Sequence, residues 1–292
     1  MTTPPQIDPR TVKAEQREAW DAISTGWQTA REVFERGAAT VTRRLLELGE
    51  VGPGHRVLDI ATGLGDPALS AARLVGATGS VVGVDISNSM LSAARRRAAE
   101  AGLDTVDFMV GDVESIDLPA GSFDVALSRW GLMFAIDHVA AFSGVRRLLV
   151  PGGVLAAAVW GPPATAPMMS LGYRVLSDRL QLPAPPPGTP GPFSMSDPRR
   201  LVAELAEAGF VDVSVTELVV PFRVDSAWQY AEFNRAVSPP KLLALLRERY
   251  GTADDLATWE AVATAAGEYQ NGDGKLSMPS ITLCVRAVAA GV

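Results

Sequence analysis

The sequence predicts an α/β fold built on a doubly wound parallel sheet, and three observations point to this class. Short apolar runs of strand length recur between residues 55 and 160. Segments of helical length separate them, and glycine- or proline-containing turns mark several of the junctions. Strands that alternate with helices in this way pair in parallel, with right-handed crossovers between them.

The elements follow in a regular order up to Trp160. Residues 11–48 carry apolar side chains at loosely helical spacing, with Gly26 and Gly37 as interruptions, which predicts two or three short helices. Ser87 or Asn88 can cap a later helix. After a turn at 52–54, strands are expected at 55–60, 80–86, 106–112, 123–130 and 154–160, with helices at 67–75, 88–102 and 138–149.

The alternation stops after Trp160, where prolines are frequent through residue 193. This composition excludes a continuous helix or a central strand and predicts a lid or connection. Helical and strand patterns then resume, and a last strand near 280–288 is expected to return to the sheet. We therefore expect a helical cap at 1–50, a cofactor-binding core at 51–160, a lid or linker at 161–196, and at 197–292 the rest of the sheet with a helical substrate-lid insertion at about 226–270.

Composition narrows the class of partner. The 292 residues are 47% hydrophobic with a net charge of −7, which fits a folded protein and argues against nucleic acid as a partner. No apolar run is long enough for a membrane span, and the first residues do not resemble a secretory signal. Cys284 is the single cysteine, no metal-ligand spacing is evident, and a cytoplasmic location is expected.

The stretch VLDIATGLGD, residues 57–66, is the first candidate binding loop. Ligands of open parallel sheets bind beyond the carboxyl ends of the strands, and Gly63 and Gly65 allow a close approach there. The spacing departs from the dinucleotide pattern G-x-G-x-x-G, and no Gly-Lys-Ser/Thr of a P-loop follows. Because Asp59 and Asp66 flank the loop, it suits a cationic ligand better than a phosphate.

Two further acids end the next strands. Asp85 follows VVGV, where a carboxylate can accept hydrogen bonds from both ribose hydroxyls of a nucleoside. Asp112 ends the third strand and can accept from an adenine amino group, while Ile86 and Val113 sandwich the ring. Three acids at successive strand ends predict a nucleoside pocket.

These stretches, with VGDVESIDLPAGSFDVALSRWGLMF and VRRLLVPGGVLAAAVW after them, resemble the class I S-adenosylmethionine-dependent methyltransferases, and most closely their ubiquinone/menaquinone-biosynthesis branch. The resemblance implies a seven-stranded, mostly parallel, Rossmann-like sheet of order 3-2-1-4-5-7-6 with the last strand antiparallel. It also implies S-adenosyl-L-methionine as the cofactor.

The resemblance assigns cofactor contacts to residues of this chain. The methionine portion would lie against Asp59 and the loop, the ribose against Asp85, and the adenine against Ile86, Asp112 and Val113. The N-terminal helices would close over the cofactor, and the end of the fourth strand would line the adjoining wall. The full set is Trp20, Trp27, Asp59, Ala61, Thr62, Gly63, Gly65, Asp85, Ile86, Met90, Gly111, Asp112, Val113, Ser128, Arg129 and Trp130.

The acceptor is less well specified. Methionine, aromatic and proline residues with few charges after residue 160 favour a small hydrophobic or aromatic acceptor, quinone-like or from secondary metabolism, methylated at oxygen or carbon. If proton removal is needed, His138, Tyr173 and Tyr230 are the candidate bases. Cyclisation or rearrangement on a bound cofactor, a nucleoside-binding protein without chemistry, and a homodimeric assembly remain open alternatives.

Overall fold

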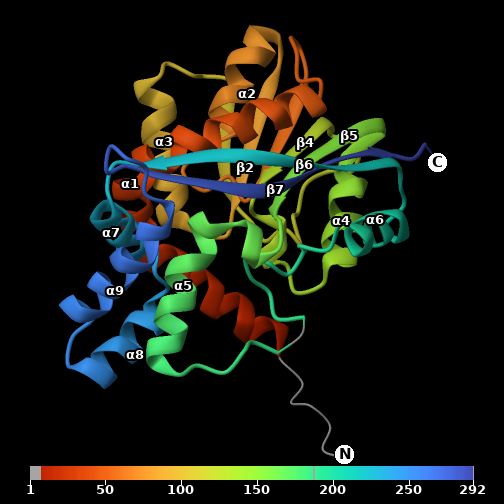
Figure 1. Ribbon diagram of the computed structural model, residues 1–292. Helices are drawn as coiled ribbons and strands as arrows, with labels where there is room; N and C mark the ends of the chain where they lie inside the picture. The colour runs from red at the N-terminus through yellow and green to blue at the C-terminus, as the bar shows by residue number, and fades with distance from the viewer. Residues whose placement is uncertain (1–7, 187, 292) are drawn as a thin grey trace, which may run out of the picture.

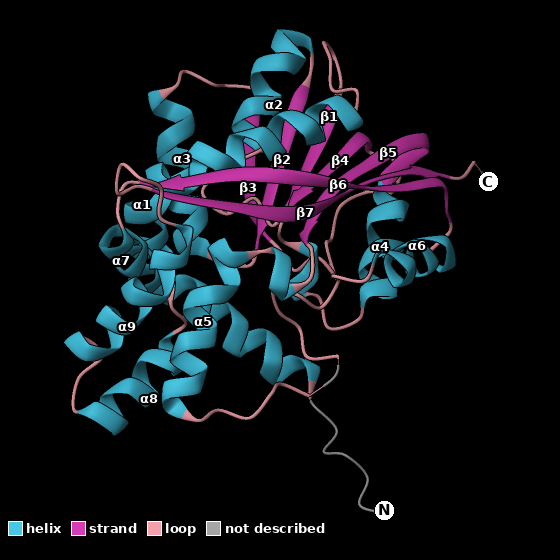
Figure 2. Ribbon diagram, viewed as in Figure 1, coloured by secondary structure: helices cyan, strands magenta, loops and turns pink. Residues whose placement is uncertain are grey.

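The computed structural model describes residues 8–186 and 188–291, so residues 1–7 of the expected cap, residue 187 of the expected lid and residue 292 lie outside the description. Seven strands form one sheet, shown in Figures 1 and 2. They are β1 (Arg56–Ile60), β2 (Ser80–Asp85), β3 (Val106–Val110), β4 (Phe123–Arg129), β5 (Leu149–Trp160), β6 (Phe210–Val224) and β7 (Leu276–Ala289).

The helices in the described part of the chain connect and cover these strands. They are α1 (Pro9–Leu48), α2 (Ala68–Val75), α3 (Asn88–Glu100), α4 (His138–Leu148), α5 (Pro167–Leu180), α6 (Pro198–Glu207), α7 (Ala227–Val237), α8 (Pro240–Tyr250) and α9 (Leu256–Ala266). Ser87 caps α3 by accepting a hydrogen bond from the backbone N–H of Met90.

The strand order is β3-β2-β1-β4-β5-β7-β6, which confirms the predicted topology. Every neighbouring pair is parallel except those made by β7, which runs antiparallel to both β5 and β6. In register, Ile60 pairs with Val84 and Asp85 with Val110. The carboxyl ends of β1, β2 and β3 therefore meet at one edge of the sheet, where the loops after them can share a ligand.

The prediction of two or three N-terminal helices is wrong, because α1 is one continuous helix of 40 residues, about 60 Å long. Its glycines are not breaks but places of close packing. A Cβ at Gly26 would lie 1.8 Å from the carbonyl oxygen of Ala236 in α7, and one at Gly37 would lie 2.6 Å from the ring of Phe222 in β6. Glycine therefore lets α1 pack against both elements without a clash.

Figure 1 shows how the helices cover the sheet. Helices α2 and α3 lie beside β1–β3, and α4 and α6 lie together, α4 against β5 and α6 against β6. Helices α5, α7, α8 and α9 form a separate group that packs on α1 and the long strands β6 and β7. The chain from residue 161 to 196, expected as a lid, contains α5 between its prolines. None of the described helices is long and apolar enough to cross a membrane.

Candidate active site

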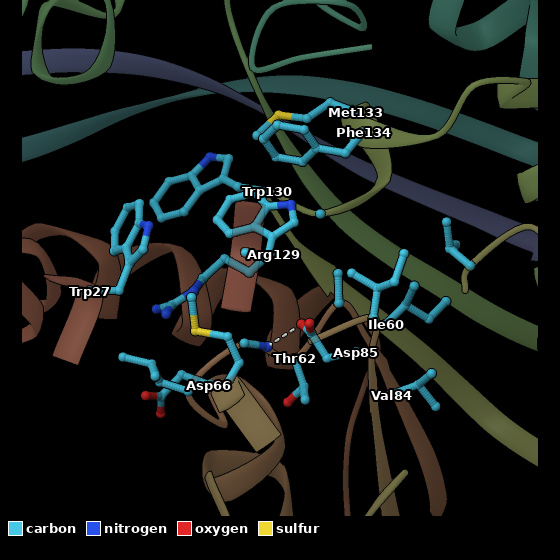
Figure 3. A pocket seen from close by; sticks show the side chains of 18 of the residues that line it. Trp27, Ile60, Thr62, Asp66, Val84, Asp85, Arg129, Trp130, Met133 and Phe134 are labelled. Atoms are coloured by element: carbon cyan, nitrogen blue, oxygen red, sulfur yellow. Dashed lines mark hydrogen bonds between the residues drawn. The ribbon is translucent and has the colours of Figure 1, made fainter. Parts of the chain in front are cut away.

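A pocket opens at the carboxyl ends of β1–β4, and residues of α1, among them Trp27, form one of its walls (Figure 3). In Figure 3, Thr62, Val84 and Asp85 lie on one side of Arg129, and Trp130, Met133 and Phe134 lie on the other. The pocket therefore has two ends of different chemistry. We call them the carboxylate end, built on the loops after β1, β2 and β3, and the aromatic end, built on α1, Trp130 and Trp160.

The loop after β1 holds its shape through left-handed backbone conformations. Gly63 has φ +54°, and a Cβ there would meet no atom within 4 Å, so the loop leaves open space on that side. Ala61 also has a positive φ, of 54°, and packs so tightly on Gly131 that a Cβ at Gly131 would lie 2.2 Å from that of Ala61. Because these residues are small, backbone atoms of the loop after β1 are exposed to the pocket.

Asp59 lies directly behind this loop and is fully buried. Its Oδ2 accepts hydrogen bonds from the Thr62 hydroxyl at 2.6 Å and the Ala68 backbone N–H at 2.9 Å. Its Oδ1 is buried and has no hydrogen-bond partner within the described parts of the chain. Burial raises the pKa of Asp59 to about 7. Asp59 thus places a carboxylate oxygen without a hydrogen-bond partner directly behind the loop, where its charge can favour a cation bound in front.

Asp85, at the end of β2, fixes the loops around it. Its Oδ2 accepts from the backbone N–H of Gly63 at 2.8 Å, the bond drawn in Figure 3, and its Oδ1 accepts from that of Ser87 at 2.9 Å. Burial raises its pKa to about 6, even though these bonds favour the charged form. The carboxylate lines the pocket and keeps lone pairs for hydroxyl donors of a ligand.

A lysine of α1, which the sequence did not single out as a site residue, lies at the end of β3. Lys13 of α1 donates to Oδ1 of Asp112 at 2.9 Å and also pairs with Glu114. This ion pair anchors the first turns of α1 over the carboxylate end. A second anchor is Asp21, whose Oδ1 accepts from the Ser87 hydroxyl at 2.6 Å.

Arg129, at the end of β4, lies between the two ends of the pocket. Its guanidinium donates to both carboxylate oxygens of Glu35 in α1, at 2.5 and 2.9 Å, and to the Thr42 hydroxyl at 2.8 Å. Although burial alone would lower its pKa, the charge of Glu35 raises it. The pair fixes α1 to the sheet.

The aromatic end is built around two stacked indoles. The rings of Trp130 and Trp160 lie 4.3 Å apart and nearly parallel, and the Trp130 N–H donates to the Thr282 hydroxyl at 2.8 Å. Phe34 packs edge-on against Trp130 and against Trp27, with ring centroids 5.2 Å apart in each case. Such a surface suits a flat apolar molecule.

Most residues expected to hold the cofactor line this one pocket. They are Trp20, Trp27, Ala61, Thr62, Gly63, Asp85, Ile86, Met90, Gly111, Asp112, Val113, Arg129 and Trp130. Asp59, Gly65 and Ser128 are not among the lining residues. Asp59 and Ser128 are buried behind it, with the Ser128 hydroxyl bonded to the Ile60 carbonyl at 3.0 Å. Gly65 packs against Leu69 and Ala94.

The three candidate bases do not line the pocket. His138, the first residue of α4, points to α6, where its Nδ1 lies 2.9 Å from Oε2 of Glu204. Tyr230 is buried in α7, where its hydroxyl donates to the Pro167 carbonyl at 3.0 Å and burial raises its pKa. Tyr173 is 45% exposed on α5. Each side chain is therefore engaged elsewhere or faces away.

Sequence reasoning missed much of the pocket wall, and the continuity of α1 explains why. The lining positions Lys13, Gln16, Trp20, Trp27, Arg31 and Phe34 recur at intervals of three, four or seven residues, which is one face of a single helix. Predicted breaks at Gly26 and Gly37 hid that continuity. Of these α1 positions only Trp20 and Trp27 were expected in the site, and Glu35, Met133, Phe134, Trp160, Met169 and Pro192 also line the pocket without having been assigned to it. No cluster suited to a metal ion occurs among the described residues.

The known proteins that this chain resembles include methyltransferases, which is consistent with the geometry of the pocket. A family profile described as "Methyltransferase domain" matches residues 57–153. The ubiquinone/menaquinone biosynthesis C-methyltransferase UbiE of Ectopseudomonas mendocina is 34% identical over 172 residues, which are 58% of this chain and 67% of that protein. The aklanonic acid methyltransferase DauC of a Streptomyces species is 40% identical over 114 residues, 39% of this chain and 52% of the relative.

Coverage and structure complete the comparison. The chain spans 63% of the length of the UbiE proteins of two Pseudomonas putida strains. The crystal structure of YcgJ from Bacillus subtilis matches 87% of this chain and all of its own, with a TM-score of 0.58 and 19% identity, which shows a shared fold. Together with the strand order and the carboxylate end of the pocket, these matches place the chain in the class I S-adenosylmethionine-dependent methyltransferases.

Proposed function

We propose that this protein transfers a methyl group from S-adenosylmethionine to an oxygen or carbon of a small, planar, largely apolar acceptor. One observation carries the proposal: a single pocket joins the strand-end carboxylates to a wall of stacked aromatic rings. The names of the relatives refer to ubiquinone/menaquinone biosynthesis and to aklanonic acid. These names support a quinone-like or secondary-metabolite acceptor, handled in the cytoplasm.

The carboxylate end fits the cofactor. The open space at Gly63, with the charge of Asp59 behind the loop, suits its methionine portion, and Asp85 suits the ribose hydroxyls. Ile86, Asp112 and Val113 suit the adenine. Bound there, the cofactor would supply a methyl group from a positively charged sulfur, with a neutral thioether as the leaving group, and the proton lost by the acceptor would be released to solvent.

The protein's own part in the reaction is then to position the acceptor and exclude water. The lining residues include no histidine, tyrosine or cysteine among those that the structure describes, so its titratable acids are the carboxylates of Glu35, Asp66, Asp85 and Asp112. Glu35 pairs with Arg129 and Asp66 pairs with Arg97, so both of these carboxylates are already engaged by a protein cation. Orientation of the acceptor between apolar walls is the contribution that these residues can make.

The test is a methyl-transfer assay with tritium-labelled cofactor and a panel of naphthoquinols and hydroxyanthraquinones. We expect label in an organic-soluble product of at least one of them. A product that forms without label would favour cyclisation or rearrangement on the bound cofactor. Cofactor binding with no product from any planar acceptor, but methylation of a highly charged one, would contradict the proposed acceptor class.

A further inference from the structure

The aromatic end of the pocket contains a polar group that the packing leaves without a partner. The indole Nε1 of Trp27 is buried and makes no hydrogen bond to any residue that the structure describes. In Figure 3 this nitrogen lies on the edge of the ring nearer Trp130. Buried donors are normally paired, because an unpaired N–H loses its bond to water without replacement. Trp27 is therefore suited to donate to an oxygen atom of a ligand.

Arg31 follows Trp27 by four residues, so the two side chains share one face of α1 and both line the pocket. The other cations of the lining are already neutralised: Lys13 by Asp112 and Glu114, and Arg129 by Glu35. Arg31 is exposed and makes no ion pair with any described residue, although Glu35 follows it by four residues on the same helix. One face of α1 thus brings to the pocket both a guanidinium without an ion pair and an N–H donor without an acceptor, among the residues that the structure describes.

We propose that Trp27 and Arg31 form a subsite for an oxygen anion carried by the acceptor, so that the acceptor is a planar aromatic compound with a carboxylate or an equally acidic oxygen. This inference rests on the proposed function and makes its acceptor class more specific. An N–H donor and a guanidinium together favour an anionic oxygen over a neutral one.

The residues around Trp27 indicate which of the two ligands, acceptor or cofactor, carries the anionic oxygen. The methionine end of the cofactor also carries a carboxylate, so both ligands of the pocket have the required chemistry. Trp27, however, packs edge-on against Phe34 and Phe233, at 5.2 and 6.0 Å, and Phe34 in turn contacts the stacked pair of Trp130 and Trp160. The N–H donor therefore belongs to the aromatic wall, which favours the acceptor as the source of the anion.

The test is calorimetry on the full chain saturated with S-adenosylhomocysteine, with anthraquinone-2-carboxylate and anthraquinone-2-carboxamide as matched probes. We expect the wild type to bind the carboxylate more tightly. Trp27→Phe, which keeps a ring against Phe34, and Arg31→Gln should each weaken carboxylate binding by about tenfold and change carboxamide binding by less than about twofold. Trp228→Phe and Arg17→Gln, exposed positions outside the pocket lining, serve as controls and should change neither.

Three results would overturn the inference. Equal losses for the two probes would mean that the residues only pack. If the wild type binds S-adenosylhomocysteine but binds the carboxylate probe no more tightly than the carboxamide probe, no anion subsite exists. A loss of S-adenosylhomocysteine affinity in Arg31→Gln would assign the arginine to the cofactor. If the wild type does not bind S-adenosylhomocysteine at all, the proposed function itself fails.

Discussion

The two ends of the pocket are built in different ways. At the carboxylate end, Asp59, Asp85 and Asp112 come from the ends of three strands that are neighbours in the sheet, so a few residues after each strand are enough to specify it. At the aromatic end, Trp130 and Trp160 come from the ends of the neighbouring strands β4 and β5, but Trp27 and Phe34 come from α1, which precedes the whole sheet in the chain. Local sequence motifs therefore specify the carboxylate end, whereas the aromatic end is complete only when α1 packs on the sheet.

The largest effect is expected where the two ends meet. Arg129→Met leaves the Glu35 carboxylate, whose side chain is 23% exposed, without its partner, and should destabilise the protein by about 3 kcal/mol. Arg36→Gln is the matched control, because Arg36 pairs with Glu32 and Asp225 at the surface and should cost at most about 1 kcal/mol. Urea unfolding measures both. Equal losses would mean that Arg129 does not hold α1 to the sheet.

The same difference explains what the sequence could predict. The parallel sheet and the carboxylate end followed from alternating strand and helix patterns and from the acids at strand ends, because neighbours in a parallel sheet share an edge, whereas the strand order followed only from the family resemblance. At the aromatic end, Trp27 and Trp130 were expected in the site, whereas Phe34 and Trp160 were not. Gly26 and Gly37 looked like helix breaks, since the partners that require them, Ala236 and Phe222, lie about 200 residues away in the chain.

The sequence also could not predict which polar side chains are buried and already hydrogen-bonded. Nothing local distinguishes His138 or Tyr230 from a base in a pocket, and only the packed structure shows His138 paired with Glu204 and Tyr230 bonded to the backbone of α5. In the same way, the unpaired nitrogen of Trp27 depends on which rings surround it. Motifs therefore predict where a ligand binds better than they predict which side chains are left to act on it.

The second effect tests the carboxylate end alone. Asp85→Asn places an amide N–H₂ against one of the two backbone N–H groups that the carboxylate now accepts, those of Gly63 and Ser87, and removes the charge proposed to bind the ribose. We expect S-adenosylhomocysteine to bind about a hundredfold more weakly, which corresponds to about 2.7 kcal/mol. Asp107→Asn, on the exposed face of β3, should leave its affinity unchanged by calorimetry. An unchanged affinity in Asp85→Asn would remove Asp85 from the site.

The third effect tests the helix that builds the aromatic end. Gly26→Ala puts a methyl group on the backbone of α7 and should cost about 2 kcal/mol in the free energy of unfolding. This loss should occur even though alanine is the better helix former by about 1 kcal/mol. Thr25→Ala, at the exposed neighbouring position, should have little effect on the same urea curves. Stabilisation by Gly26→Ala would show that α1 does not pack closely on α7.

The smallest expected effect is a pH dependence that belongs to the carboxylate end only. Burial raises the pKa of Asp59 to about 7 and that of Asp85 to about 6 in the free protein, against an ordinary value of 3.8. Because the folded pKa values are raised, these groups stabilise the free protein below about pH 4, and that contribution is lost as the pH rises to about 7. A cationic ligand favours the charged carboxylates, so its binding must release the protons that they hold at low pH.

Affinity for S-adenosylmethionine should therefore rise between pH 5.5 and pH 8, by at most about tenfold per pH unit for each proton released. Asp59→Asn is a well-matched variant, since the amide oxygen can replace Oδ2 towards Thr62 and Ala68, while the N–H₂ takes the place of the unpartnered Oδ1. It should flatten the part of the profile near pH 7. Isothermal titration in two buffers of different ionisation enthalpy counts the protons directly. A profile that is equally steep in Asp59→Asn would mean that this buried acid is already ionised before the ligand arrives, and that the aspartate at the end of β1 organises the loop without meeting the cation's charge.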